Sequence, residues 1–382
     1  MIALSQPSHR ADIVVIGGGI HGCSAALYLA QHGMSVIVLE KDSVGRHASG
    51  VNAGGVRRLG RHLAEVPISL RSMQIWHGVA DFLGDDCGFQ VAPQIKLARS
   101  EADLEQMRAR VAEMHAHGYT HEVIVGGNEV REHIHSLSDE VIGGIACLED
   151  GFAQPYQTTF AIQRKAKSLG ARFHEGVRAE QVLRDPGGDW RVTTPEGTFS
   201  APKLLLTGGL WSGQISASLG EPAPIIPFAP MMLVTTRLRP FCHAVVGAAG
   251  VPLSFKQMQN GTVVIGGGRP GLPDAATNRA ETIFHPLRLS AQVCAALFPI
   301  MAETSIVRTW AGLEARMPDD IPVVGPSLRH EGLYYAFGFS GHGFQLGLGM
   351  GATMADLIAT GSTYIDLAPF SIGRFSADTR SP

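Results

Sequence analysis

The chain has 382 residues, of which 45% are hydrophobic and 17% charged, a composition typical of a globular protein large enough for two domains. A net charge of −3 without a long basic run argues against nucleic acid as a partner. No apolar stretch reaches the roughly 20 residues of a membrane-spanning helix, so we expect no transmembrane segment. The five cysteines are scattered and the first residues lack a signal-peptide pattern, which favours a cytoplasmic location without a disulfide framework, zinc site or iron–sulfur cluster.

The first chemical motif begins at the predicted strand Ile13–Ile16, which runs into the sequence GGGIHG. Helix-forming residues follow, and a second predicted strand, Val36–Leu39, ends at Glu40. The N–H groups and positive dipole end of a helix N-terminus bind a pyrophosphate, and an acidic residue near this offset binds a ribose. This order predicts a complete βαβ dinucleotide site, whose glycines are Gly17, Gly19 and Gly22.

The hexapeptide VVIGGG of residues 14–19 occurs again at residues 263–268, with the same glycine spacing. Asn260 and Gly261 precede the second copy and are typical of a hairpin turn, whereas Pro270 and Pro273 follow it. Proline at these positions would break any helix that received a phosphate. We therefore predict a β-hairpin strand here, and one dinucleotide site in the chain.

The other elements alternate between helical and β patterns. Residues 41–62 are rich in Gly, Ser, Asn and Arg and predict an irregular loop that crosses the cofactor. Ser100 and Asp103 form a capping pair at the start of one predicted helix. Further predicted elements are a helical region at 62–83, a strand at 89–98, a turn, helix and strand at 149–177, a hairpin and buried strand at 189–211, short β runs at 221–305, and a strand, glycine turn and helix at 332–361.

Six stretches resemble one known family when taken in order: DIVVIGGGIHGCSAALYLAQHGMSVIVLE, HASGVNAGGVRR, DGFAQP, LLLTGGLW, WAGLEARMPDDIPVVG and GLYYAFGFSGHGF. They resemble the flavin-dependent amine oxidoreductases of the D-amino-acid oxidase and sarcosine oxidase superfamily, nearest to its branch of sarcosine oxidase β-subunits, hydroxyproline dehydrogenases and opine oxidases. The resemblance implies an α/β fold, with a Rossmann-like FAD-binding domain of the glutathione-reductase type and an interleaved, mainly antiparallel β substrate domain. We expect residues 1–88, 146–222 and 306–382 in the FAD-binding domain, and 89–145 and 223–305 in the substrate domain.

The resemblance also implies FAD as the cofactor and a set of residues that bind it. A helix starting at about Gly343 would aim its N–H groups at the negative charge near N1 and O2 of a reduced flavin. The expected contacts are Gly17, Gly19, Ile20, His21 and Gly22 at the pyrophosphate, Glu40 and Lys41 at the adenosine ribose, Arg46, His47, Ser49, Asn52 and Gly54 along the crossing to the flavin, Val177 at the adenine, Thr207, Gly208 and Trp211 over the AMP half, and Gly341, His342, Gly343, Phe344 and Gln345 at the pyrimidine edge of the flavin.

Three side chains are candidates for the substrate side. Arg57, or its neighbour Arg58, could hold a substrate carboxylate, the alternative being a solvated or structural arginine pair. Lys256 resembles a lysine that promotes the reaction with oxygen in sarcosine oxidases, but a strand lysine facing water is the plainer interpretation. His342 could contact substrate or flavin, or could satisfy backbone groups of its turn.

Two further positions bear on the resemblance. Glu314 stands in Gly312-Leu313-Glu314, where D-amino-acid oxidases have an arginine that binds a carboxylate. An anionic Glu314 cannot do so, which leaves room for a secondary amine, a cationic substrate or a different clamp. His47 lies in a sequence similar to one through which some relatives attach FAD covalently, so covalent attachment is a weaker alternative.

The predicted function is FAD-dependent oxidation of the C–N bond of an amino acid or N-substituted amino acid (a D-amino acid, hydroxyproline, a sarcosine-like compound or an opine) to an imine, by hydride transfer to flavin N5. One alternative is a flavin- and substrate-binding subunit of a heteromeric amine dehydrogenase with electron-accepting partner subunits. Another is a C–O-oxidising relative that acts on a 2-hydroxy acid or glycerol phosphate. We predict no metal site, because the histidines near the middle of the chain read as a solvated surface: His115, His117, His121, His133 and His135.

Overall fold

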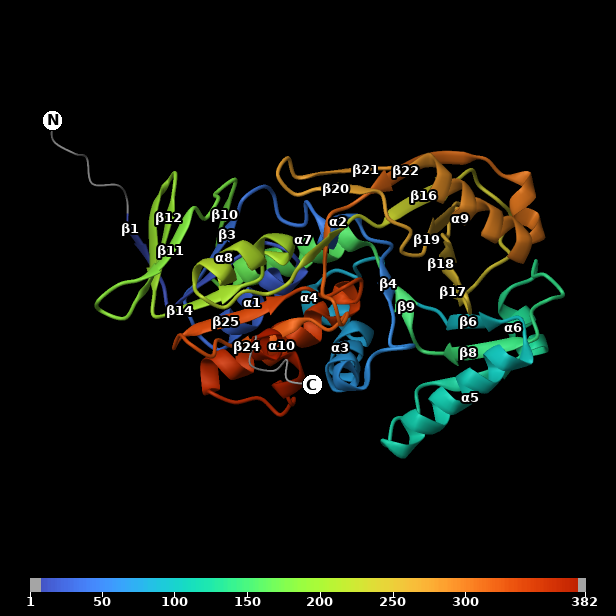
Figure 1. The fold of residues 1–382 in the computed structure, drawn as a ribbon, viewed down its shortest axis with the longest axis horizontal. Coiled ribbons are helices and arrows are strands. Elements are labelled where there is room, and N and C mark those ends of the chain that lie inside the picture. Colours follow the sequence, from blue (N-terminus) through green and yellow to red (C-terminus); the bar gives the residue numbers. More distant parts are fainter. Residues whose placement is uncertain (1–7, 377–382) are drawn as a thin grey trace.

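In the computed structural model, residues 8–376 are described, and they form two halves that lie side by side (Figure 1). The first half is built on a six-stranded sheet in which five neighbouring strands are parallel and the last is antiparallel. In spatial order its strands are β10 (Arg172–Glu175), β3 (Val36–Glu40), β2 (Ile13–Ile16), β14 (Lys203–Leu206), β25 (Leu333–Phe337) and β24 (Val323–Pro326).

Both faces of this parallel sheet are covered, which explains its almost continuously apolar strands. Val15 and Val38 face a core shared with helices, whereas Val14 and Ile37 face a core shared with a second sheet. The helices are α1 (Ile20–Gln31), α3 (Val66–His77), α7 (Pro155–Ser168) and α10 (Gly343–Thr360). The second sheet contains β1 (Ser8–Arg10), β13 (Gly197–Ala201), β12 (Trp190–Thr194) and β11 (Gln181–Arg184).

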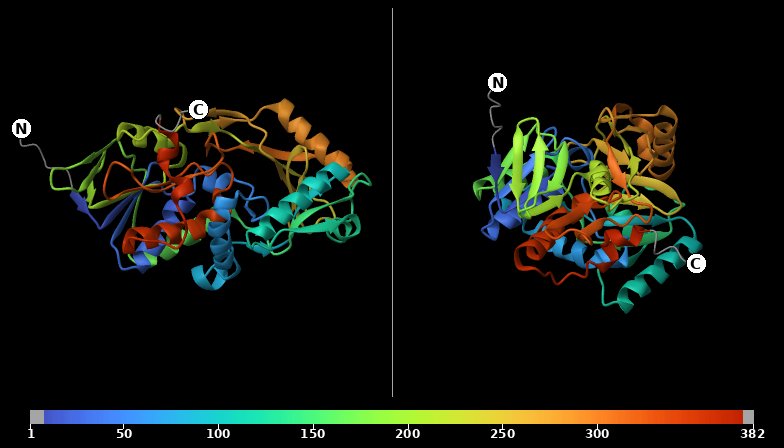
Figure 2. Two further views of the ribbon diagram at one scale, coloured as in Figure 1. Left: turned by 60° about the horizontal axis from the view of Figure 1, so that its bottom comes forward. Right: turned by 60° about the vertical axis from the view of Figure 1, so that its left-hand side comes forward.

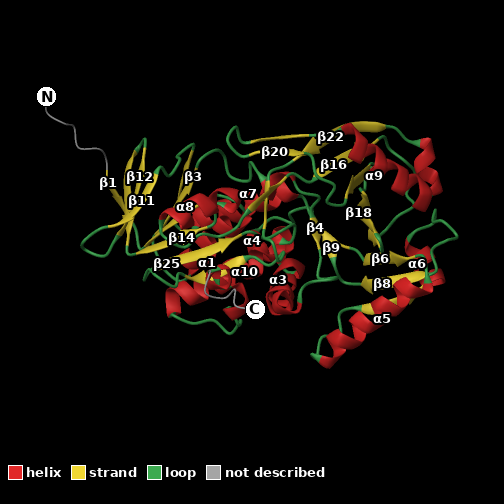
Figure 3. Ribbon diagram, viewed as in Figure 1, coloured by secondary structure: helices red, strands yellow, loops and turns green. Residues whose placement is uncertain are grey.

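The other half is built on an eight-stranded sheet that is antiparallel except where β17 pairs with β6. Helix α9 (Phe284–Leu297) packs on β16, β18 and β19, and α5 (Glu101–Ala116) and α6 (Gly127–His133) pack on β7 and β8. Figure 2 (left) and Figure 3 show α5 and α9 at the end of the molecule away from the four-stranded sheet. In spatial order the strands are β22 (Ile306–Ala311), β16 (Met231–Thr235), β19 (Val263–Gly266), β18 (Val251–Gln257), β17 (Val245–Ala248), β6 (Gln94–Ala98), β8 (Gly143–Cys147) and β7 (Val123–Gly126).

The remaining elements are short. They include α2 (Ala48–Val51), β4 (Gly55–Val56), a 3₁₀ helix at Leu63–Glu65, α4 (Val79–Leu83), β5 (Gln90–Val91), β9 (Gly151–Phe152), a 3₁₀ helix at Gly209–Trp211, α8 (Ser212–Ser218), β15 (Ile226–Phe228), β20 (Leu272–Asp274), β21 (Arg279–Glu281), a 3₁₀ helix at Pro299–Glu303, β23 (Glu314–Arg316), and two 3₁₀ helices at Ala368–Phe370 and Ile372–Phe375. Within residues 8–376, no helix is long and apolar enough to cross a membrane.

The second VVIGGG is a hairpin strand, as predicted. It forms β19, which pairs antiparallel with β18 across a turn at Gly261, where φ is +86°. The chain then enters the hairpin of β20 and β21 rather than a helix. The predicted capping pair of Ser100 and Asp103 is also confirmed, because each side chain accepts a backbone N–H from the other residue.

Two boundaries differ from the sequence-based expectation. The predicted strand at 89–98 is two strands, β5 and β6, which belong to different sheets. Strand β22 (Ile306–Ala311) pairs with β16 in the eight-stranded sheet, although the expected boundary at residue 306 grouped it with the FAD-binding domain. A change of sheet leaves no mark in the hydrophobic pattern of a strand, so neither boundary could be located from the sequence.

Candidate active site and cofactor cradle

The turn between β2 and α1 is held in one conformation by close backbone contacts. Gly17 has φ of +116°, which favours glycine. A Cβ atom on Gly22 would lie 1.9 Å from the carbonyl oxygen of Gly17. Thr207, at the end of β14, donates its hydroxyl to the carbonyls of Ile16 and Gly17 at 3.1 and 2.9 Å. The turn is therefore fixed with the N-terminus of α1 beside an open cavity.

Two cavities meet at this turn. The smaller encloses about 960 Å³ of empty space and the larger about 2210 Å³, open mouths included. The larger volume exceeds the roughly 300–1,000 Å³ typical of one drug-sized ligand, so an extended cofactor and a substrate can be accommodated together. Both cavities are lined by Gly19, Ala48, Ser49, Thr207, Gly209, Glu314 and Ala315.

The smaller cavity contains the residues expected at the adenosine. Glu40 is buried, and its carboxylate accepts the N–H groups of Gly18 and Asp42 at 2.7 and 2.8 Å. The N–H of Val177 is bonded to the carbonyl of Glu40, so only the Val177 carbonyl is left to face an adenine. The ammonium of Lys41 lies 3.7 Å from the centroid of the Trp211 ring, and both residues line this cavity.

His47 and Arg46 also line the smaller cavity. Nε2 of His47 lies 2.7 Å from Asp42, and its ring packs on Trp211 at 4.6 Å between centroids. His47 thus stands among the residues expected at the adenosine and is absent from the wall of the larger cavity. Its position does not favour a covalent bond to a flavin ring in the larger cavity.

The larger cavity is where the starts of α1 and α10 meet. Helix α10 begins at Gly343 as predicted, and Gly341, Gly343 and Phe344 line the cavity wall. The ring of His21 stacks on Phe339 at 3.6 Å between centroids and 6° between planes. Burial lowers the pKa of His21 to about 3, so its imidazole is neutral.

Both ring nitrogens of His21 are buried without a well-formed hydrogen bond among residues 8–376, although the backbone of Gly343 lies beside the ring. A buried polar atom without a partner is costly, which indicates that a bound group supplies the missing contact here. Because His21 follows the glycine turn and lines the larger cavity, these orphan nitrogens fit a dinucleotide that runs from one cavity to the other.

Three expected cofactor residues use their side chains to shape the protein instead. Ser49 accepts the N–H of Ile20 at 2.9 Å, and Asn52 bonds to the carbonyl of Ala48 and the N–H of Gly54. The amide of Gln345 is buried against Ser69 of α3 and lines neither cavity. The backbone carbonyl of Gln345 accepts from Ser72 and Trp76, so neither it nor the side chain faces the cradle.

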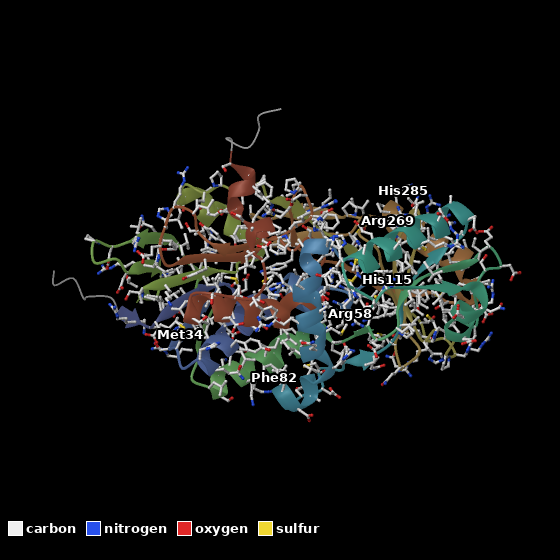
Figure 4. The ribbon with its side chains drawn as sticks, turned by 90° about the horizontal axis from the view of Figure 1, so that it is seen from below. Met34, Arg58, Phe82, His115, Arg269 and His285 are labelled. Atoms are coloured by element: carbon white, nitrogen blue, oxygen red, sulfur yellow. The ribbon has the colours of Figure 1, made fainter. Side chains whose placement is uncertain are left out.

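The two predicted arginines have different surroundings. Arg57 lines the larger cavity, and its Nη1 donates to the carbonyl of Leu59 at 2.7 Å. Arg58 is buried, and its Nε and backbone N–H both donate to Asp150, at 2.8 Å each. Figure 4 shows Arg58 close to α3, between the two halves of the molecule. Arg58 is thus structural, and Arg57 is the member of the pair that faces the cavity.

Arg61 also faces the larger cavity, and its position was not predicted. It is only 2% exposed, and it donates to the carbonyls of Arg57 and His342 at 3.0 and 3.4 Å. Its Nη1 is buried without a partner among the described residues. Burial, and then the charge of Arg57, lower the pKa of Arg61 to about 9. The contact with His342 joins residues 281 positions apart, so no local pattern could have singled out Arg61.

His342 points into the protein rather than into a cavity. Its Nδ1 lies 3.0 Å from the carboxylate of Glu65, which is fully buried. Burial lowers the pKa of His342, whereas Glu65 acts in the opposite direction. The side chain of His342 lines neither cavity, which argues against direct contact with substrate.

Lys256 is buried, contrary to the plainer interpretation of a strand lysine facing water. It is 5% exposed, and its ammonium lies 4.5 Å from the centroid of the Phe152 ring. A Cβ atom on Gly54, a residue of the larger cavity, would lie 3.2 Å from this nitrogen. Burial lowers the pKa of Lys256 to about 7.

Of the five histidines expected on a solvated surface, three are exposed (His115, His117 and His135), whereas His121 and His133 are partly buried. Among residues 8–376, no group of three or more His, Cys, Asp or Glu side chains could hold a metal ion. His115 lies on α5 (Figure 4) and lines neither cavity.

These features define a dinucleotide-binding oxidoreductase, with a glycine turn at the edge of a parallel sheet, a cradle of two adjoining cavities and a helix N-terminus at the reactive end. Residues 12–357 match the model of the family described as FAD dependent oxidoreductase. The chain belongs to this family, and its cofactor is FAD.

Curated relatives span almost the whole chain. The β-subunit of the sarcosine oxidase of Arthrobacter sp is 27% identical over 378 residues, which cover 97% of this chain and 92% of that protein. One subunit of the opine oxidase of Rhizobium meliloti is 26% identical over 384 residues, covering 97% and 99%.

Solved structures confirm the fold. The L-proline dehydrogenase from P. horikoshii has a TM-score of 0.90 at 26% identity, covering 97% of this chain and 98% of its own. The glycine oxidase from Geobacillus kaustophilus has a TM-score of 0.88 at 24% identity, covering 97% and 100%. The predicted fold class and the predicted cofactor are thus both confirmed.

Proposed function

We propose that this enzyme oxidises the C–N bond of an amino acid or N-substituted amino acid to the imine. The observation that carries the proposal is Nη1 of Arg61, a buried donor without a partner among the described residues, in the wall of the larger cavity. The names of the relatives support the same substrate class, because they include sarcosine, opine, proline and glycine enzymes.

The arginines explain how the substrate is held. A buried guanidinium with an unused donor gains most from a carboxylate, which accepts charge-assisted hydrogen bonds. The carbonyls of Arg57 and His342 fix the orientation of Arg61, so little side-chain freedom remains to be lost on binding. Arg57 adds a second positive charge in the same wall.

FAD, when bound, supplies the oxidising centre that accepts a hydride at N5. The chain's own part is to hold the carboxylate, to exclude water from the C–N bond and to stabilise negative charge at the start of α10. The first turn of α10 offers backbone N–H groups at the larger cavity for that last task. The imine product then hydrolyses in water.

The position of Lys256 indicates which electron acceptor reoxidises the reduced flavin. Lys256 lines neither cavity itself, but its buried amine lies directly behind Gly54 of the larger cavity, where its charge would favour reduction of oxygen. We therefore propose an oxidase. The alternative is a chain that passes electrons to partner subunits, which is favoured by the two relatives that are named as subunits of larger enzymes.

The test is anaerobic reduction of the purified holoenzyme by pools of D- and L-amino acids, proline and hydroxyproline isomers, sarcosine and opines, followed in the visible flavin band. We expect at least one amine pool to bleach the band, and readmitted air to restore it. Bleaching by 2-hydroxy acids or glycerol phosphate alone would show that a C–O bond is oxidised instead. Bleaching by an amine without recovery in air would identify a dehydrogenase.

A further inference from the structure

Glu314 is an acidic side chain at the centre of the cradle. It begins β23, which pairs with β15, and it lines both cavities. Its carboxylate accepts the N–H of Gly341 at 2.6 Å. One oxygen is thereby fixed by the backbone, while the residue remains part of the cavity walls.

Glu314 and Arg61 are anchored on the same turn. Glu314 bonds to Gly341, and Arg61 bonds to the next residue, His342. Neighbouring Cα atoms lie about 3.8 Å apart, so the two anchoring points are close together. Even so, Glu314 forms no ion pair within residues 8–376, and only burial and the N–H of Gly341 act on its pKa. The cavity therefore presents a positive and a negative group that do not neutralise each other, an arrangement complementary to a zwitterion.

No positively charged side chain among the described residues forms an ion pair with Glu314. Arg57 and Lys96 line the larger cavity, where His21 is neutral. On β23 itself, Arg316 pairs with Asp320. The remaining groups of the walls lie at the smaller cavity and are Glu40, Lys41, Arg46, His47 and Arg178, while His342 is bonded to Glu65. Burial raises the pKa of Glu314 to about 7.

We propose that Glu314 binds the ammonium group of the amino-acid substrate and accepts one of its protons. The proposal rests on the proposed function. In this step an N–H bond of the ammonium breaks, its electron pair stays on nitrogen, and an O–H bond forms on Glu314, so no oxidant is required. The freed lone pair is the one that forms the C=N bond when the hydride leaves the α-carbon. Arg61 holds the carboxylate of the same molecule.

A carboxyl group whose pKa lies near 7 suits this task, because a general base works best when its pKa lies near the operating pH. Glu314 is then ionised above pH 7 and ready to accept a proton from an amine whose own pKa is higher. Below pH 7 it is protonated, and the ammonium loses both its counter-charge and its base.

Glu314→Gln separates this role from a structural one. The glutamine keeps an oxygen for the N–H of Gly341 but cannot take a proton at any pH used. Glu331→Gln is the matched control, because the side chain of Glu331 is 91% exposed. The holoenzyme is mixed anaerobically with the amine that reduces the wild type, and the second-order rate constant of bleaching is measured from pH 6 to pH 10.

For the wild type and Glu331→Gln, we expect this constant to rise with pH to a plateau, with an inflection between pH 6 and 8. Glu314→Gln should lack this inflection, fall by about 100-fold at pH 7.5, and recover as the pH approaches the pKa of the amine. An equal loss at every pH, or an unchanged profile, would overturn the proposal.

Binding of propionate, followed by the perturbation of the flavin spectrum, gives a readout without turnover. The wild type should bind propionate more tightly as the pH falls below 7, because protonation of Glu314 removes a repulsive charge, whereas Glu314→Gln should keep only the weaker dependence due to Lys256, whose pKa is also about 7. If no amine reduces the wild type, the proposed function fails and this proposal fails with it. If the wild type is reduced and propionate binding has the same pH dependence in both proteins, only the role of Glu314 is wrong.

Discussion

Glu65 and His342 join the two segments that shape the substrate end of the cavity. The carboxylate of Glu65 lies 3.0 Å from Nδ1 of His342, at the start of α10, and Glu65 ends the 3₁₀ helix that follows Arg61. Arg61 also donates to the carbonyl of His342. His342 therefore connects the segment of Arg61 and Glu65 to the start of α10 through both its ring and its backbone. His342 is therefore a positioning residue.

His342→Ala should destabilise the protein by about 2–3 kcal/mol, because it leaves the buried carboxylate of Glu65 without this partner. Burial would raise the pKa of Glu65, but the His342 hydrogen bond and the neighbouring positive charges keep it below the ordinary value of 4.5. The stability from this pair is thus present above about pH 4.5 and is lost as the pH falls. Urea unfolding at pH 7 should separate the variant from the wild type, and the difference should shrink at pH 4. A constant difference would contradict this assignment, and exposed His115→Ala is the control.

Gly22→Ala should abolish tight FAD binding, because the added Cβ would lie 1.9 Å from the carbonyl oxygen of Gly17. We expect the affinity to fall by at least about 100-fold as the turn and the start of α1 move apart. FAD titration of the apoprotein measures this loss. Gly78→Ala serves as the control, since its nearest contact would be 3.9 Å away. FAD bound equally well by Gly22→Ala would show that this turn does not receive the cofactor.

Lys256→Met should slow the reaction of the reduced enzyme with oxygen by about 100-fold, while anaerobic reduction by substrate changes little. Because burial lowers the pKa of Lys256 to about 7, its positive charge is present below pH 7 and lost above it. Reoxidation of the wild type should therefore slow as the pH rises through 7, and that of the variant should not depend on pH in this range. Stopped-flow mixing with oxygenated buffer measures both. Reoxidation that is equally fast in wild type, Lys256→Met and the α7 control Lys165→Met would remove Lys256 from the oxygen reaction.

The cofactor turn could be predicted from the sequence because the residues that form it are close together along the chain. Strand, glycines, helix and Glu40 follow each other along the chain, and the prolines after the second VVIGGG were enough to reject a second site. The direction of a side chain at a helix start is less predictable. Successive residues of a helix turn by about 100°, so Phe344 faces the cavity while Gln345 faces α3.

The substrate end depends on contacts between distant segments. Arg57 and Arg58 are neighbours of the same type, but Asp150, 92 residues further on, draws Arg58 away from the cavity. Arg61 and Glu314 reach the same turn only because they bond to two neighbouring residues of it, His342 and Gly341. Sequence patterns do not encode such long-range contacts, so Arg61 was missed and Glu314 could be noted only as a departure from relatives.

The most direct test of the substrate assignment compares one amino acid that reduces the holoenzyme with the carboxamide of the same compound. Anaerobic bleaching is measured for the wild type, Arg61→Leu and the exposed control Arg108→Leu. In the wild type and Arg108→Leu, the carboxamide should react about 100-fold more slowly than the amino acid, because the neutral amide loses the charge-assisted hydrogen bond to Arg61 and replaces one acceptor oxygen with an N–H donor. In Arg61→Leu, both compounds should react at similar, slow rates. A carboxamide that bleaches the wild-type flavin as fast as the amino acid would contradict the assignment.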